Sequence, residues 1–270
     1  MKGLMVLSNM LRVCILQAML GGVGLAGAGQ AHDVWITFLP GVHGILLPVI
    51  NHGHPGDRKA PDPDKLYQLR VIAPSGPGET VPPTGRSQTL DGVPVLLMAP
   101  IETKGQSGTW IVTARYDNGY WVKTAHGYRN TSKLEFPNVL ESVHSMKLAK
   151  ALIFAGASAD VSDRAVGHRL ELVSLDDPFA LSIGDMLHVR VLFEGKPMKG
   201  LGLEIGDGVT PRKEEAIPRY HTNADGIAAL PIGRFGLQVI TVDYKGPSRN
   251  PALADADLLV ATLSFVITEK

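Results

Sequence analysis

The residues best suited to chemistry in this sequence are histidines, because imidazole is a common protein ligand for nickel, cobalt, copper and zinc. His52 and His54 are separated only by Gly53, in a stretch rich in glycine, proline and aspartate. On a flexible loop, such a pair of imidazoles can close on one metal ion. For the pair taken alone, two solvated loop histidines are the alternative.

His32 has a second donor if the chain is cut after Ala31, because it then becomes the first residue of the mature protein. Its free α-amine and its ring Nδ1 can chelate one ion together. Asp33 can add a ligand or orient an imidazole from outside the coordination sphere. Residues 34–36 (Val-Trp-Ile) should anchor this end to a core, whereas a frayed terminus in solvent is the alternative.

The other histidines are weaker candidates. His126 lies in a predicted turn after a strand, where a solvated surface position is the alternative to a ligand role. His188 stands in an apolar alternation and is expected to be a structural strand residue, while His43 and His221 have no local partner. The predicted metal ligands are therefore His32, His54, His52 and His126.

Signatures of enzymes are missing from the sequence. It has no Gly-x-Ser-x-Gly, no His-Glu-x-x-His and no phosphate-binding loop. Its single cysteine, Cys14, lies in the leader, so the mature chain has neither a thiol nucleophile nor a disulfide. Asp57, Asp62 and Asp64 lack the spacing of a calcium loop. We therefore expect a protein that is not an enzyme.

Residues 1–31 have the composition of a secretory signal peptide. Lys2 and Arg12 precede an uncharged apolar run, and Gly29 and Ala31 occupy the minus-three and minus-one positions of the proposed cut. A retained membrane anchor is the alternative, since the run approaches the lower limit for a membrane span. We expect a periplasmic protein without membrane insertion after cleavage, and the formal net charge of 0 offers no basis for nucleic-acid binding.

The elements that must position these residues are predicted to be strands. Short apolar and β-branched runs alternate with turn residues, and no long amphipathic helix is expected. Residues 51–65 and 74–86 are predicted as loops, and 117–119 as a turn. The expected strands include 34–36, 45–50, 66–73, 93–98, 108–116, 120–123, 141–154, 168–173, 186–193, 202–205, 227–232, 236–244 and 258–267.

This spacing predicts an all-β protein with two sandwich domains after the signal peptide. The N-terminal domain is expected over residues 32–157 and carries all the candidate metal ligands. The C-terminal domain is expected over residues 165–270. A small, polar stretch at 155–163 marks the predicted boundary.

The chain resembles the DUF4198 family of exported proteins. The start at Ala31-His32-Asp33-Val34-Trp35-Ile36 is similar to the family's Ala-His-x-x-Trp-Leu, and His54 matches its Gly-His element. Residues 167–175 resemble the family's Gly-His-x-Leu-Glu-Ile-x-Pro-Leu. Further similar pieces are Trp121–Thr124, Ser132-Lys133, Lys147–Leu152, Gly184-Asp185, Gly195–Pro197, Asp225-Gly226 and Ala261–Phe265.

The resemblance implies immunoglobulin- or transthyretin-like sandwiches and an accessory role in nickel or cobalt uptake, in which the metal is delivered to a membrane importer. It carries ligand roles to His32 and His54, whereas a ligand at His126 would be specific to this protein. Two alternatives stay open. One is a copper protein with a brace formed by His32 and a second histidine, as a chaperone or an oxidase. The other is an envelope or adhesive module without metal. Zinc is also possible as the ion.

Overall fold

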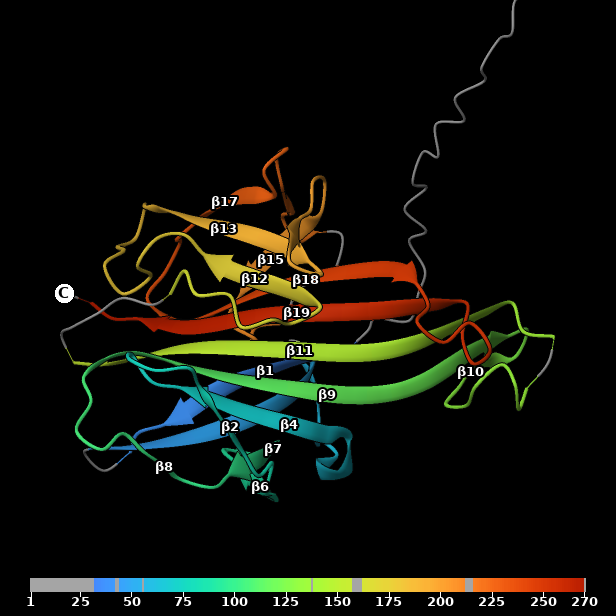
Figure 1. The fold of residues 1–270 in the computed structure, drawn as a ribbon, viewed down its shortest axis with the longest axis horizontal. Helices are drawn as coiled ribbons and strands as arrows, with labels where there is room; N and C mark the ends of the chain where they lie inside the picture. The colour runs from blue at the N-terminus through green and yellow to red at the C-terminus, as the bar shows by residue number, and fades with distance from the viewer. Residues whose placement is uncertain are drawn as a thin grey trace, which may run out of the picture. The chain divides into compact units, whose positions relative to one another are not determined.

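The computed structural model of the protein describes residues 32–269 apart from 42–43, 55, 137, 157–161 and 212–215 (Figure 1). The predicted signal peptide, its cut after Ala31 and the candidate His43 lie outside the described residues. Residues His32–Lys270 form one compact unit.

A nine-stranded sheet forms the middle layer of this unit, with β11 at its centre (Figure 1). Among the described strands, only β11 and β19 pair in parallel; the other pairs are antiparallel. Its strands, in spatial order, are β16 (Tyr220–His221), β15 (Gly202–Gly206), β18 (Gly236–Pro247), β19 (Ala256–Ile267), β11 (Glu141–Ala155), β9 (Gly108–Thr124), β4 (Leu66–Ile72) and β5 (Glu79–Val81), with β10 (Gly127–Arg129) beside β9.

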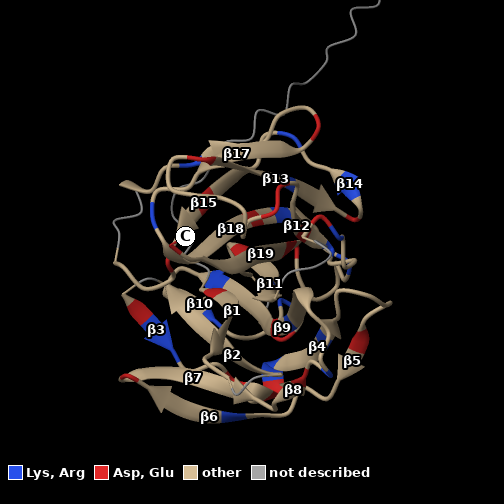
Figure 2. Ribbon diagram, turned by 90° about the vertical axis from the view of Figure 1, so that its left-hand side faces the viewer, with Lys and Arg blue, Asp and Glu red and all other residues tan. Residues whose placement is uncertain are grey.

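Two smaller sheets cover the two faces of the middle sheet, as the turned view shows (Figure 2). The six-stranded sheet contains β1 (Asp33–Leu39), β2 (Ile45–His54), β7 (Val93–Met98) and β6 (Gly85–Leu90), with β3 (Asp57–Lys59) and β8 (Ile101–Glu102) beside β2. The four-stranded sheet contains β12 (Leu170–Ser174), β13 (Met186–Phe193), β14 (Lys196–Pro197) and β17 (Ile227–Pro231).

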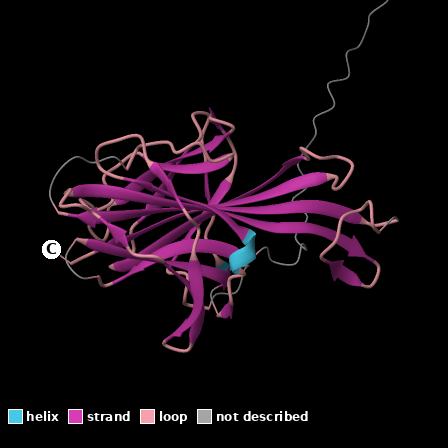
Figure 3. Ribbon diagram, turned by 60° about the horizontal axis from the view of Figure 1, so that its bottom comes forward, coloured by secondary structure: helices cyan, strands magenta, loops and turns pink. Residues whose placement is uncertain are grey.

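The prediction of an all-β protein built from packed sheets is confirmed. No α-helix occurs among the described residues. A short 3-10 turn, η1 (Pro63–Lys65), is drawn in cyan in Figure 3. Within the same residues, no helix has the length and apolar character needed to cross a membrane.

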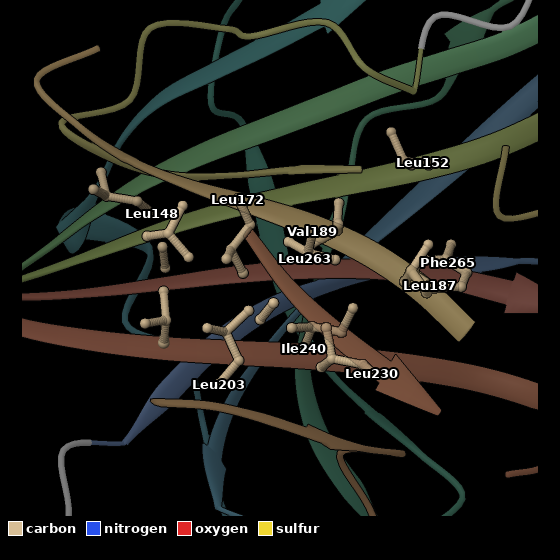
Figure 4. Close-up of a cluster of buried hydrophobic side chains, with 14 of the residues drawn as sticks. Leu148, Leu152, Leu172, Leu187, Val189, Leu203, Leu230, Ile240, Leu263 and Phe265 are labelled. Carbon is tan, nitrogen blue, oxygen red and sulfur yellow. The ribbon is translucent and has the colours of Figure 1, made fainter. Parts of the chain in front are cut away.

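Alternation along β11 explains why both faces of the middle sheet are buried. Leu148 and Leu152 join the core under the four-stranded sheet, where Figure 4 shows them with Leu172. Ala149 and Ala151 join the core under the six-stranded sheet. Successive strand residues point to opposite faces, so one strand serves two cores. Each fully buried leucine contributes about 1.5–3 kcal/mol to folding.

The prediction of a loop over residues 51–65 is wrong for its first part. β2 continues to His54 and β3 follows at Asp57–Lys59, so both histidines of the pair lie on a strand. The breaker residues in this stretch suggest a loop when it is read locally. Cross-strand hydrogen bonds with β1 on one side and β3 on the other override that preference. The loop predicted over 74–86 likewise contains β5 and the start of β6.

The predicted turn at residues 117–119 is wrong as well. β9 runs unbroken from Gly108 to Thr124, and the register with β11 shifts between Ser145 and Met146. One extra residue in β9 at this point makes a β-bulge, and the Asp117 Oδ1 accepts a hydrogen bond from Gly119 N at 2.9 Å. The Asp-Asn-Gly signal therefore marks a bulge inside a strand.

The predicted domain boundary falls between β11 and β12. Strands from both sides of it share the middle sheet, because β11 pairs with β19 from Val143 to Ala151. The division into domains over 32–157 and 165–270 stays a prediction.

Candidate metal centre

The pairing of β1 with β2 decides which side chains meet at the start of the described chain. Asp33 lies opposite Gly53, and Val34 lies opposite His52. One step further along this register, His32 lies opposite His54. Directly opposite residues share a face of the sheet, and so do residues two apart. The three imidazoles therefore lie on the face of Val34, which points into the core between the six- and nine-stranded sheets.

The ring positions confirm this arrangement. The ring centroid of His32 lies 5.2 Å from that of His52 and 5.0 Å from that of His54, both edge-on, at interplanar angles of 83° and 70°. Imidazoles that share one ion have centroids roughly 5 Å apart, since each nitrogen then lies about 2.0 Å from the metal. The spacing of the rings thus suits a common ion.

The donor atoms are not yet gathered on one point. Across the described part of the chain, no group of three or more His, Cys, Asp or Glu side chains is already arranged to hold a metal ion. Coordination would therefore require the rings of His32, His52 and His54 to rotate within the spacing that the strands set.

Unpaired ring nitrogens are the observation that best fits a bound ion. Among the described residues, the Nε2 of His54 and both nitrogens of His52 are buried with no partner in hydrogen-bond geometry. The Ala60 backbone is near enough to the His52 ring to affect its pKa, but a contact outside that geometry does not satisfy a ring nitrogen. Buried polar atoms nearly always have a partner, so such atoms require an explanation. A transition-metal ion satisfies the lone pair of a neutral imidazole, and the three rings therefore fit such an ion.

The electrostatics of the site favour neutral imidazoles. The pKa of His52 is lowered to about 4, first by burial and then by the neighbouring His32 and Lys147, while a backbone contact with Ala60 opposes this shift. Burial also lowers the pKa of His32, with a further contribution from His54. Protonated imidazole cannot bind a metal, so these shifts keep His32 and His52 in the binding form at neutral pH.

Gly53 allows the two flanking histidines to share a strand beside β3. Its φ is +126°, a conformation that side chains rarely adopt. A Cβ at this position would lie 2.5 Å from the Asp57 carbonyl oxygen and 2.9 Å from the Arg58 Cα. The glycine therefore lets β3 approach the backbone between the histidines.

Asp57 joins the site through the same register, opposite His54 across β2 and β3. Its Oδ2 lies 3.8 Å from the His32 Nε2, and its side chain is 60% exposed. Asp57 also accepts a hydrogen bond from Lys59 at 2.7 Å; the acidic and basic colours of β3 are visible in Figure 2. From the sequence, Asp57 is a candidate only for calcium, because the strand pairing is not visible there.

Tyr116 and Lys147 form the inner wall of the site, and neither is among the site residues expected from the sequence. The Tyr116 ring lies 5.5 Å from that of His52, and its hydroxyl accepts a hydrogen bond from Asp62 N at 3.1 Å. Lys147 on β11 is 1% exposed, and its Nζ has no hydrogen-bond partner in the described part of the chain. Lys147 lies between the apolar residues Met146 and Leu148 of β11, and the sequence does not reveal that its ammonium is buried beside the histidines.

Asp33 anchors the start of β1 to the middle sheet. Its Oδ2 accepts a hydrogen bond from the Thr241 Oγ1 on β18 at 3.3 Å. Burial raises the pKa of Asp33, and the charge of Lys147 opposes that rise. Burial lowers the pKa of Lys147, and Asp33 opposes that fall. Asp33 thus fixes the backbone beside His32 from the other side of the strand.

The family of this chain follows from a match over residues 29–246 to the model described as "Domain of unknown function (DUF4198)". The chain belongs to the DUF4198 family. The matched segment includes all three clustered histidines as well as Asp57 and Lys147.

Other comparisons with this DUF4198 chain reveal only distant likenesses. No curated protein matches the sequence. A chimeric titin Z1Z2 carrying a KLER peptide from decorin is 13% identical, with 89% of this chain and 100% of that chain covered and a TM-score of 0.18. The titin Ig tandem A164-A165 is 9% identical, with coverage of 89% and 100% and a TM-score of 0.18. The Bacillus anthracis TIE protein is 11% identical, with coverage of 88% and 42% and a TM-score of 0.16. Likenesses at such TM-scores carry no argument about this fold.

The structure of the DUF4198 chain does not bring His126 to the cluster. His126 is exposed in the turn between β9 and β10, where its N–H donates to the Thr124 Oγ1 at 3.1 Å. From Tyr116 beside His52, β9 continues to Thr124 over roughly 26 Å of extended chain, at about 3.3 Å per residue. His126 therefore cannot share an ion with the other three.

His168 and His188 have structural surroundings. His168, which matches a family element, is 5% exposed just before β12, and burial lowers its pKa to about 3. His188 lies on β13, as expected, and its Nδ1 lies 2.9 Å from an Asp176 carboxylate oxygen.

Proposed function

We propose that this protein is exported to the periplasm, binds a divalent transition-metal ion at His32, His52 and His54, and delivers it to a membrane importer. Nickel and cobalt are the proposed ions, and the proposed role is binding rather than catalysis. The histidine cluster is the observation that carries the proposal. The His32 ring centroid lies 5.2 Å from that of His52 and 5.0 Å from that of His54. Buried ring nitrogens of His52 and His54 have no partner in hydrogen-bond geometry among the described residues.

Cleavage after Ala31 would add a fourth nitrogen donor, the α-amine of His32. An α-amine has an ordinary pKa of about 7.7–8.0, so it must lose a proton to bind at neutral pH. Metal affinity should therefore fall as the pH drops, first through the amine and then through the imidazoles. Asp57 is near enough to His32 to join the ion or to orient that ring.

The burial of the ligands suggests how an ion enters and leaves. His52 is 8% exposed and forms the inner end of the site. The side chains of His32 and Asp57 are 30% and 60% exposed, so they form its outer end. A partner can take the ion by replacing the outer ligands first, because these side chains already face solvent.

The test uses protein exported through its own leader, with intact mass and elemental analysis on one sample. We expect a mass that begins at His32 and about one metal ion per chain. In calorimetric titration with Ni²⁺, His32→Ala and His54→Ala should each weaken binding at least tenfold, by analogy with the effects of disturbing a metal ligand shell. His126→Ala is the matched control and should bind like the unaltered protein.

Unchanged stoichiometry and affinity in His32→Ala would refute the proposed site. Metal-free protein that takes up no Ni²⁺, Co²⁺, Cu²⁺ or Zn²⁺ on titration would instead favour an envelope or adhesive module. A bound ion with an uncut leader would keep the imidazole site and remove the amine ligand.

Copper is the second candidate, and one observation favours it: the clustered ligands are nitrogen donors, without sulfur. The stability series places Cu²⁺ above Ni²⁺ and Co²⁺ at such sites, and an amine with imidazoles suits its tetragonal geometry. A Cu²⁺ complex with nitrogen hyperfine structure in its electron paramagnetic resonance spectrum would support a copper carrier. Oxidase turnover by that complex would contradict a purely binding role.

A further inference from the structure

A cleft of about 720 Å³ opens at the end of β1 that lies away from the histidines. Its lining is mostly apolar and comes from the ends of β1, β11 and β19, from the start of β2, from Leu237 of β18 and from the segment after β12. The rings of Phe154 and Phe179 pack at 5.4 Å, while Phe154 and Val266 are each 49% exposed. Apolar side chains gathered at one exposed place commonly mark a binding surface.

The cleft borders the free edge of β1, which is the edge strand of the six-stranded sheet. Two carbonyls on that edge accept hydrogen bonds from the middle sheet. The Thr262 Oγ1 donates to the Val34 carbonyl at 2.7 Å, and the Ser264 Oγ donates to the Ile36 carbonyl at 2.6 Å. The first half of the β1 edge is therefore closed by side chains of β19.

Phe38 is the next residue of this series, because alternate residues of an antiparallel strand direct their backbone groups to the same side. The corresponding residue of β19 is Val266, whose side chain cannot donate a hydrogen bond. In the register with β2, Phe38 lies opposite Pro48, two residues beyond the pair of Ile36 with Ile50. The backbone groups of Phe38 therefore point away from β2, as those of Val34 and Ile36 do. The β1 edge is thus open at Phe38, directly beside the apolar cleft that Phe38 lines.

We propose that this cleft binds an extended peptide segment of a partner protein as an added strand beside β1. The backbone of the segment pairs with Phe38, and its apolar side chains cover Val266 and Leu237. Strand addition to an exposed edge is a common mode of peptide recognition. A small apolar molecule would also fit the volume, but it would leave the open backbone edge unpaired.

The charge of the cleft indicates what flanks the apolar residues of the segment. Asp177 is the one charged residue among the described residues that line it. One of its carboxylate oxygens accepts the Phe179 N–H at 2.9 Å, which fixes the side chain at the rim. A basic residue next to the apolar ones would complement this carboxylate. The inference is independent of the metal site.

The test measures fluorescence anisotropy of a labelled peptide, Lys-Val-Thr-Val-Thr-Val, with the whole mature chain. We expect saturable binding, and at least a tenfold loss of affinity when alternate backbone nitrogens of the peptide are methylated. The Val266→Asp variant should likewise bind the unmethylated peptide with at least tenfold lower affinity. Val209→Asp is the matched control, because Val209 is 56% exposed and does not line the cleft. If Val266→Asp does not fold, Phe154→Asp replaces it in the test and should lower the affinity for the peptide in the same way.

Several outcomes would overturn the proposal. Equal binding of the methylated peptides would show apolar contact without strand addition. Binding of 8-anilinonaphthalene-1-sulfonate that Val266→Asp abolishes, without binding of any peptide, would show a small-molecule cleft. A concentration-dependent dimer in sedimentation that Val266→Asp dissociates would make a second copy of the chain the occupant. No binding of any probe would refute the site.

Discussion

His168 is an ionisable side chain that the fold buries apart from the histidine cluster. It is 5% exposed, and its pKa is lowered to about 3 first by burial and then by the nearby charges of Arg115, Lys150 and Arg70. The folded protein therefore holds a neutral ring over a pH range in which the unfolded chain protonates it. Its family resemblance is thus compatible with a structural role.

We predict that His168 makes the protein less stable as the pH falls below about 6.5, the ordinary histidine pKa. The unfolded chain then binds one more proton than the folded chain, so the free energy of unfolding falls by up to about 1.4 kcal/mol per pH unit, until the pH nears the folded pKa of about 3. Urea unfolding at pH 7, 6 and 5 measures this slope. His168→Gln should reduce the slope, and an equal slope in both proteins would contradict the prediction.

Gly53 gives a second prediction at the residue scale. Gly53→Ala combines a positive φ with a Cβ 2.5 Å from a β3 carbonyl, and should destabilise the protein by about 1–3 kcal/mol. Gly92→Ala is the control, since Gly92 has a φ of +79° and no heavy atom within 4 Å of the added Cβ. Urea unfolding of both variants separates the steric contact from the backbone conformation. Equal losses in the two variants would mean that the approach of β3 is unimportant.

Buried ionic contacts join elements that lie far apart in the sequence. Lys150 on β11 donates to the Arg164 carbonyl at 2.6 Å and lies 3.4 Å from the Glu171 carboxylate on β12. Glu171 in turn accepts the N–H groups of Val166 and Gly167, at 2.6 and 2.9 Å. Both charged side chains are at most 2% exposed. One carboxylate thus holds the segment before β12 against the middle sheet.

We predict that Glu171→Ala destabilises the protein by about 3–5 kcal/mol, because it leaves the Lys150 ammonium buried without its counterion. The matched control is Glu141→Ala, which removes the partner of the more exposed Lys245 and should change stability by at most about 1 kcal/mol. Urea unfolding at neutral pH compares the two variants. A small effect in Glu171→Ala would show that the backbone alone holds this segment.

Over the whole molecule, residues far apart in the sequence meet on the face of β1 opposite Val34. The Arg58 guanidinium lies 4.4 Å from the centre of the Trp35 ring. It also donates to the Asn51 Oδ1 at 2.5 Å and to the Gly208 carbonyl at 3.3 Å. Gly208 packs so closely on Trp35 that an added Cβ would lie 2.8 Å from the ring. These contacts support the strands that carry the histidines.

We predict that Arg58→Met destabilises the protein by about 1–3 kcal/mol, since the Asn51 oxygen and the Gly208 carbonyl lose a charged donor. Ni²⁺ affinity should also fall, because β1 and β2 are then held less firmly. Arg129→Met is the control, since Arg129 stacks on Phe136 in an exposed region. Thermal unfolding and Ni²⁺ titration measure the two effects. Unchanged affinity in a destabilised Arg58→Met would separate this contact from the site.

The sequence by itself determined many of the strands and part of the site. Period-two alternation identified β4 and β13 nearly to the residue, because each strand buries mainly one side in a core. The same period places His52 and His54 on one face of any strand that contains both. The apolar residues after His32 likewise indicated that this end of the chain is anchored.

Only the tertiary structure decided which residues meet. The β1–β2 register brings His32 to the histidine pair, and the β2–β3 register adds Asp57. The long, unbroken β9 keeps His126 away from them. Strand pairing depends on hydrogen bonds and core packing between segments distant in the sequence, and local residue preferences do not encode those partners. Residues 51–59 show this most directly, because their glycines and proline indicate a loop while pairing in the sheet makes strands of 51–54 and 57–59.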